Sequence, residues 1–367
     1  MPKAVVVAGA SGLVGNAALR RFAADGYEAI GVSRRPPLVS DGATIVPLDL
    51  ADADACANFV GEYGARVTHV VYAAQYEAPG LAPGWFDPDA IARNGAMLAN
   101  LMTPLLAAAR GLEHVSLLQG SKAYGMHHPD LLDKIRTPLR EREPRLEHPN
   151  FYFVQEDWLK AHQGSWGLTV WRPTVVYGDA PGVNMNALRG IAVYAALERA
   201  AGKKTLDYPG GTYDQPFQEA IDVDLLASAL AWAARSDGAR DRVFNVTNGD
   251  TFTWRHTWPA VCRAFGMEPG GHRPQELASE LPKRDDEWAA LVDRHGLAAA
   301  KSIAEHCGAN SLLYSDWMLG AIEGVAAPLN STIAIRQAGF AECVDTEDMF
   351  VRWMTHLQET GVVPASR

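Results

Sequence analysis

The chain has 367 residues, a formal net charge of −10 and 48% hydrophobic residues, enough for one large domain or two coupled ones. The acidic balance argues against nucleic acid and against an anionic membrane surface as partners. We expect a cytoplasmic protein, because no apolar run could span a bilayer, no signal-peptide core precedes the first strand, and the four scattered cysteines form no CxxC pair.

Apolar runs alternate with helical patterns through the first half of the chain, which predicts a parallel α/β sheet. The predicted strands are 4–8, 28–33, 44–48, 67–73, 114–118, 168–171 and 242–246, and the predicted helices are 13–25, 52–63, 89–110, 152–163 and 222–234. Two proline-containing segments, 77–89 and 135–149, interrupt the alternation. The second is too charged for the core, so we expect a surface loop or flap near the site.

These elements predict a Rossmann-type, doubly wound parallel sheet with a smaller, mainly helical C-terminal domain. Residues 1–178 are expected to form the nucleotide-binding domain, rejoined by about 214–250. Residues 179–213 and 251–367 are expected to form the smaller substrate-binding or lid domain.

A glycine-rich turn, GASGLVG at 9–15, follows the first predicted strand and opens the first helix. Glycine permits a tight turn and lets a pyrophosphate approach the helix N-terminus, where N–H groups and the helix dipole favour negative charge. A glycine motif alone is weak, but a strand before it and a helix after it make it a dinucleotide-binding signature.

The second predicted strand ends in Ser33, Arg34 and Arg35, where an NAD enzyme usually carries an acid for the ribose hydroxyls. Guanidinium groups suit a 2′-phosphate, so we expect NADPH/NADP as cofactor; the alternative is a solvated basic pair. Asp49 ends the third strand where the adenine edge usually lies, and a helix cap is its alternative role.

The stretch PNFYFVQEDWLKAH (149–162) resembles the helix of short-chain dehydrogenases that carries a catalytic Tyr-x-x-x-Lys pair. Here Tyr152 is followed four residues later by Glu156. A carboxylate beside a phenol raises the phenol's pKa, whereas an ammonium lowers it. Lys160 is roughly 12 Å further along the helix, so the positive charge must come from another element.

The fifth predicted strand runs into LLQGSKAYG (117–125). Ordinary extended short-chain dehydrogenases place a Ser or Thr four residues before a Tyr-Gly pair, and counting back from Tyr124 that position is Gly120. Ser121 is adjacent, and Lys122 lies two residues past the vacant position. The ordinary serine and lysine positions are thus both empty while a lysine appears nearby, which suggests that Lys122 supplies the charge for Tyr152.

At this point the sequence resembles the progesterone 5β-reductase/iridoid synthase-like (PRISE) enone reductases, an atypical branch of the extended short-chain dehydrogenases. The resemblance covers nearly the whole chain and rests on GASGLVGN, SRRP, QGSKAYG, NFYFVQED, WRPTVVYG and FNVTNGD. Two departures stand out. The family's second tyrosine is Phe153, and its Val-Thr-Trp is Ala73-Ala74-Gln75 here, followed by an inserted APGLAPGW, which changes the pocket wall beside the nicotinamide.

The resemblance implies NADPH-dependent reduction of the activated C=C bond of an α,β-unsaturated carbonyl compound, with catalysis by Tyr152 and Lys122. It implies a small apolar enone as substrate and a homodimer, as is common among relatives. The expected cofactor contacts are Gly9, Ser11, Gly12, Leu13, Val14, Gly15, Ser33, Arg34, Arg35, Asp49, Leu50, Ala73, Gln119, Tyr152, Pro173 and Val175.

Two other functions stay open at this point. One is an NADP(H)-dependent carbonyl reductase, or a nucleotide-sugar epimerase or dehydratase, against which Glu156 and Gly120 argue. The other is a non-catalytic regulator that senses NADPH, which predicts cofactor binding without turnover.

Several side chains have ordinary alternatives to a functional role. His127 and His128 beside Asp130 suggest a metal, but the spacing fits no usual ligand set, so we expect a loop and no metal. Trp85, Met185 and Phe217 are candidates for an apolar pocket wall, with core packing as the alternative. Tyr124 is expected to be structural or to pack against the nicotinamide, and Arg172 is expected to be structural.

Overall fold

The backbone divides into two units in the computed structural model, which describes residues 3–78, 80, 82–211, 213, 217–308, 310–320 and 328–366. The first unit comprises Met1–Thr174, Val223–Thr247 and Asn330–Glu342, and the second comprises Val175–Asp222, Asn248–Leu329 and Cys343–Arg367. The segment that returns to the sheet is therefore shorter than the expected 214–250. In addition, Asn330–Glu342 joins the first unit, where a bridge pairs Leu139 with Asn330.

The strands are β1 (Ala4–Ala8), β2 (Glu28–Ser33), β3 (Thr44–Pro47), β4 (Val67–Tyr72), β5 (His114–Leu118), β6 (Gly167–Pro173), β7 (Val175–Tyr177), β8 (Thr205–Tyr208), β9 (Ala220–Asp222), β10 (Arg242–Val246) and β11 (Glu268–His272). The helices are α1 (Leu13–Ala24), α2 (Ala53–Tyr63), α3 (Pro88–Ala108), α4 (Phe151–Ala161), α5 (Ala187–Ala200), α6 (Val223–Ala233), α7 (Trp254–Ala264), α8 (Leu277–Glu280), α9 (Asp285–His295), α10 (Ile303–Cys307), α11 (Ser311–Met318), α12 (Ile333–Gln337) and α13 (Thr346–Glu359).

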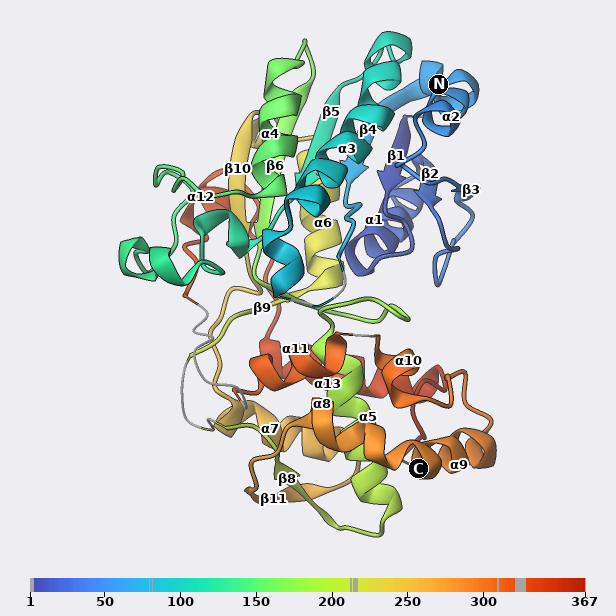
Figure 1. The fold of residues 1–367 in the computed structure, drawn as a ribbon, viewed down its shortest axis with the longest axis vertical. Coiled ribbons are helices and arrows are strands. Elements are labelled where there is room, and N and C mark those ends of the chain that lie inside the picture. Colours follow the sequence, from blue (N-terminus) through green and yellow to red (C-terminus); the bar gives the residue numbers. More distant parts are fainter. Residues whose placement is uncertain are drawn as a thin grey trace. The chain divides into compact units, whose positions relative to one another are not determined.

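The first unit is built on a seven-stranded sheet in the order β10-β6-β5-β4-β1-β2-β3 (Figure 1). Every neighbouring pair is parallel. The chain winds outward from β1 to β3 and then returns to the other side of β1 with β4. This reversal confirms the doubly wound Rossmann fold, and in such folds the crevice at the reversal receives the ligand.

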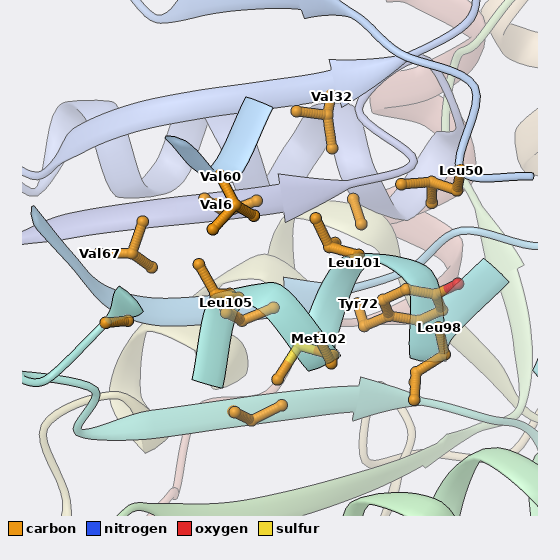
Figure 2. Packing of buried hydrophobic residues seen from close by; sticks show 14 of the residues in the cluster. Val6, Val32, Leu50, Val60, Val67, Tyr72, Leu98, Leu101, Met102 and Leu105 are labelled. Atoms are coloured by element: carbon orange, nitrogen blue, oxygen red, sulfur yellow. The ribbon is translucent and has the colours of Figure 1, made fainter. Parts of the chain in front are cut away.

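Helices cover the sheet in two groups. Helix α1 packs against α6, whereas α3 packs against both α2 and α4. Figure 2 shows the second group's core, in which Leu98, Leu101, Met102 and Leu105 of α3 meet strand residues such as Val6. Burying each such side chain contributes about 1.5–3 kcal/mol, so the sheet edge that carries the site rests on a rigid base.

The second unit is mainly helical, as the sequence predicts. Helix α5 packs against α11, and α13 packs against α7. Two small parallel pairs, β7 with β9 and β8 with β11, complete the unit; strands this short were not foreseen. None of the helices in the described ranges is both long and apolar enough to cross a bilayer.

Candidate active site

The turn after β1 has two positions that require glycine. Gly9 has φ +85°, and a Cβ there would lie 2.8 Å from the carbonyl group of Ala73 at the end of β4. A Cβ on Gly15 would lie 2.1 Å from the Gly9 oxygen. Side chains at these positions would push the turn away from β4 and helix α1 away from β1. The glycines therefore bring the N-terminus of α1 to the point where the strand order reverses.

The N-terminus of α1 differs from those of its neighbours. Gly12 is its N-cap, no side chain caps it, and its first turn contains no acid. By contrast, Asp52 caps α2, Asp87 caps α3 and Asn150 caps α4 through side-chain oxygens. Residues 11–14 (Ser11, Gly12, Leu13 and Val14) are only half-buried. These features fit a pyrophosphate, which would accept hydrogen bonds from the N–H groups of this turn.

The end of β2 presents the expected basic pair to solvent. The Ser33 hydroxyl donates to the Arg35 carbonyl at 2.5 Å and so folds the backbone back at this point. Arg34 and Arg35 are both exposed, and within the described part of the chain neither guanidinium is engaged in an ion pair. The two groups are therefore available for an anionic ligand.

The residues expected near the adenine, Asp49, Leu50 and Ala73, differ in their exposure and in their hydrogen bonds. Asp52, not Asp49, caps α2, so the helix-cap alternative for Asp49 is wrong; its exposed carboxylate accepts from the Ala51 N–H at 3.0 Å. The Leu50 side chain is buried in the core and its carbonyl accepts from the Asn100 amide at 3.0 Å, so both are occupied within the protein. Ala73 donates to the Ala8 carbonyl at 2.9 Å, directly beside the glycine turn.

Asn150 joins the two segments that carry the predicted catalytic residues. Its side-chain oxygen accepts from the Tyr152 N–H at 3.0 Å, and its amide nitrogen donates to the Lys122 carbonyl at 3.1 Å. Ala123 packs in one cluster with Tyr152 and Phe153. Helix α4 and the turn η3 (Ser121–Tyr124) are thus fixed to each other by one amide side chain.

The Tyr152 phenol lies over the C-terminal ends of β5 and β6. A Cβ added to Gly120 would be 3.2 Å from the phenol oxygen and 3.7 Å from the Pro173 carbonyl. The 3.2 Å distance is tighter than nine in ten real Cβ contacts, so a side chain at position 120 would displace the phenol by a few tenths of an ångström. Glycine at this position leaves the phenol undisturbed.

We expect Gly120→Ala to lower kcat about tenfold with little change in cofactor affinity, since small misplacements of a reacting group are costly. Steady-state kinetics and a cofactor titration measure the two effects. Gly111→Ala is the matched control, because a Cβ there meets nothing within 4 Å. Equal turnover in both variants would show that the phenol does not depend on this space.

Lys122 is half-buried as a residue but its Nζ is buried, and this atom lies 4.2 Å from the ring centroid of Trp85. Within the described residues Nζ has no hydrogen-bond partner. Burial lowers the pKa of Lys122 to about 8, against the opposing influence of the Glu77 charge. A lysine ammonium on an aromatic face, with no hydrogen bond among the described residues, can act electrostatically on another group.

Glu156 occupies the position where ordinary relatives have lysine, and donor side chains surround its carboxylate. It accepts from Lys160 at 2.6 Å and from Gln119 at 2.9 Å, and the Arg172 guanidinium lies 3.9 Å away. Burial raises the pKa of Glu156, but hydrogen bonds from Lys160 and Gln119 outweigh it and the pKa lies below its ordinary value. Glu156 therefore fixes α4 to the sheet as a paired carboxylate.

Gln119 connects Glu156 to Tyr152. Its amide nitrogen also donates to the Tyr152 carbonyl at 3.2 Å, while its oxygen accepts from Arg172 at 3.2 Å. Arg172 lies over the Tyr124 ring, and the Tyr124 hydroxyl donates to Asn245 at 2.6 Å. The Gln119 side chain is thus occupied within the protein, so a role toward the cofactor falls to its backbone.

Three of the candidates belong to the second unit. Val175 lies in β7, and Met185 and Phe217 are also residues of that unit. Phe217 is 56% exposed, so it is not a core residue. Trp85 does lie at the predicted site, in contact with Lys122.

Sequence reasoning missed two members of the site. Asn150 was visible as a helix-cap residue type directly before α4, and that signal could have identified it. His148 lies against His127 and His128, and no spacing in the sequence indicates this meeting.

Comparison with known proteins adds a family and relatives. A family profile described as a PRISE-like Rossmann-fold domain matches residues 83–363. The (S)-8-oxocitronellyl enol synthase of Nepeta cataria is 28% identical over 379 residues, covering 98% of this chain and 92% of that protein. The 3-oxo-Δ(4,5)-steroid 5-β-reductase of Arabidopsis thaliana is 27% identical over 384 residues, with the same coverage of both chains.

Solved structures share the fold at lower identity. A putative epimerase from Burkholderia cenocepacia superposes with a TM-score of 0.65 at 18% identity, covering 97% of this chain and 98% of that one. The UDP-glucose 4-epimerase of Bifidobacterium longum, solved with NAD+ and UDP, has a TM-score of 0.65 at 16% identity and the same coverage.

Proposed function

Because this chain belongs to the family of PRISE-like Rossmann-fold domains, as its motifs predicted, we propose that it is an NADPH-dependent enone reductase. It reduces the activated C=C bond of an α,β-unsaturated ketone or aldehyde. The named relatives are a steroid 5-β-reductase and an enol synthase, and both names fit chemistry on a conjugated carbonyl compound.

The chemistry follows the build-up of charge. Bound NADPH supplies hydride to the β-carbon, and negative charge then develops on the carbonyl oxygen as an enolate. The Tyr152 phenol donates a hydrogen bond to that oxygen, as an oxyanion-hole donor does. The Lys122 ammonium supports this donation electrostatically, and the α-carbon takes its proton from water.

The observation that carries the proposal is the placement of the Tyr152 phenol. It lies directly over Gly120, where ordinary relatives have a serine, and at the strand ends where the ligand crevice of this fold lies. The same region holds a buried lysine that makes no hydrogen bond among the described residues. This combination supplies a donor and a positive charge without a second hydroxyl.

The same observation separates the proposal from its nearest rivals. A carbonyl reductase or a sugar epimerase of the ordinary extended type uses the serine and the lysine on the tyrosine's own helix. Here those positions are Gly120 and Glu156, and the Glu156 carboxylate is paired with Lys160. A non-catalytic NADPH sensor has no use for a phenol and a desolvated lysine whose segments are joined by Asn150.

The cofactor preference gives a prediction of its own. Arg34→Ser combined with Arg35→Ser should weaken NADPH binding by at least about 100-fold, because each lost charged hydrogen bond costs about 1.5–3 kcal/mol and the double variant loses two. NADH binding should change little, since it lacks the 2′-phosphate. Fluorescence titrations with both cofactors test this. Arg110→Ser, at an exposed position after α3, serves as control, and an unchanged preference in the double variant would reduce the pair to surface charge.

Product identification tests the reaction itself. The purified protein is incubated with NADPH and a small cyclic enone, and in parallel with a steroid enone. The products are separated by chromatography and identified by mass spectrometry. A saturated ketone is the expected product. An allylic alcohol would mean carbonyl reduction, and tight NADPH binding without a product over a wide enone panel would favour the sensor.

The finer features of the protein's setting are also proposals. A small apolar enone fits the aromatic ring of Trp85 beside Lys122. A cytoplasmic location fits four cysteines that are all free thiols, three of them buried. A homodimer is the expected state, and light scattering of the purified protein measures it.

A further inference from the structure

Three histidines from two loops meet beside the proposed site. His127 and His128 follow the turn that carries Lys122, and His148 precedes Asn150. One potential ligand atom from each lies within 4.8 Å of the other two. The rings of His127 and His128 have centroids 4.4 Å apart, and His148 lies 5.4 and 4.7 Å from them.

The hydrogen bonds identify which nitrogens are available. His127 Nδ1 and His128 Nε2 are buried and have no hydrogen-bond partner among the described residues. His148 Nδ1 lies 2.9 Å from the Leu146 carbonyl. Because a carbonyl oxygen can only accept, that nitrogen carries the proton and Nε2 carries the lone pair. Its polar neighbours among the described residues include the Asn150 amide, at a long 3.3 Å, and the Lys122 backbone.

We propose that His127, His128 and His148 form a binding site for a divalent transition-metal ion of the zinc type. Three neutral imidazoles with one position left for water are an established ligand set for Zn²⁺. The proton on His148 Nδ1, directed at a backbone carbonyl, is the outer-shell arrangement that orients a metal-binding histidine. Tetrahedral bonds of about 2.1 Å place ligand nitrogens about 3.4 Å apart, so modest side-chain rotations close the site.

The position of the site gives it a consequence. His127 and His128 belong to the segment after Lys122, and His148 is two residues from Asn150, which binds the Lys122 carbonyl and caps the Tyr152 helix. An ion at this site crosslinks the two loops that position the proposed catalytic residues. Neither the family nor the proposed reaction requires it.

A zinc titration tests the site without reference to activity. Chelator-treated full-length protein competes with a chromophoric indicator for Zn²⁺, and we expect one ion per chain, with visible absorption bands when Co²⁺ is used instead. His128→Ala should weaken binding by at least about 10- to 100-fold, the cost known for lesser, outer-shell changes. His128→Phe should do the same while keeping the ring packing against Phe86.

His162→Ala is the matched control, because this histidine is exposed and its ring stacks on Trp158, away from the three-histidine cluster. It should bind Zn²⁺ as the parent protein does. The proposal is overturned if the parent protein shows no saturable binding, or if His128→Phe, folded as judged by circular dichroism, binds Zn²⁺ with the parent affinity. Either result would leave the three rings as an aromatic cluster.

Discussion

Tyr152→Phe should lower kcat for enone reduction by about 100- to 1,000-fold, the cost of losing one oxyanion-hole donor. The substitution removes only the phenol oxygen, which lies over Gly120, and keeps the ring that packs with Ala123 and Phe153. The affinity for NADPH should stay within about twofold, because the lost interaction acts in the transition state and not in ground-state binding. Steady-state kinetics with a cyclic enone, together with a cofactor titration, measure both quantities.

Tyr124→Phe is the matched control for this experiment. Tyr124 is a buried tyrosine from the neighbouring turn whose hydroxyl donates to Asn245 at 2.6 Å. Its loss should cost about 1–3 kcal/mol of stability, because it leaves the Asn245 oxygen unsatisfied, while kcat stays near the parent value. Equal loss of turnover in the two variants, or equal loss of turnover and NADPH affinity in Tyr152→Phe, would remove the role assigned to Tyr152.

Lys122→Met should abolish most of the activity and at the same time raise the stability of the protein. Burial lowers the pKa of Lys122 from 10.5 to about 8. At neutral pH the buried ammonium therefore costs on the order of 3 kcal/mol relative to the unfolded chain. The cation–π contact with the Trp85 ring offsets at most about 2 kcal/mol of this cost. Methionine of similar length leaves a net gain of about 1 kcal/mol, measurable by urea denaturation.

The pH dependence of the stability has a definite sign. The folded-state pKa lies below the unfolded value, so the folded state carries the full cost of the ammonium below about pH 8. Between about pH 8 and the ordinary value of 10.5 the unfolded chain binds more protons, and the parent protein gains stability as pH rises. Lys122→Met should lack this gain.

Activity should follow the opposite course. The kcat/KM of the parent enzyme should decline above about pH 8 as Lys122 loses its charge. Lys134→Met provides the control, because Lys134 is exposed and its replacement should change stability and turnover little. A Lys122→Met protein that is less stable than the parent, or that remains fully active, would contradict the assigned role.

The fold was largely predictable because its signals are local. Strand runs, helical periodicity and the glycine turn each occupy a few consecutive residues, and their alternation determines the sheet order. Strands β7 and β9, of three residues each, are too short to produce a pattern. The return of Asn330–Glu342 to the first unit depends on long-range contacts, such as the bridge to Leu139 and the packing of α12 on β10, which no local signal marks.

The candidate site also combines residues that a local signal identifies with residues that only long-range contacts bring together. The displacement of lysine from position 156 to 122 was readable from motif spacing, and its catalytic meaning stays a prediction. The aromatic face beside Lys122 comes from Trp85, in the segment before α3, and the third histidine comes from a segment twenty residues after His128. These contacts form through tertiary packing of irregular loops, where periodicity carries no information.

The position of hydride transfer tests the central claim most directly. NADPH carrying deuterium at the transferable C4 position is supplied with a cyclic enone, and the product is examined by nuclear magnetic resonance. We expect a saturated ketone with a single deuterium on the β-carbon, formed far more slowly by Tyr152→Phe. Deuterium on the carbonyl carbon of an allylic alcohol would contradict it.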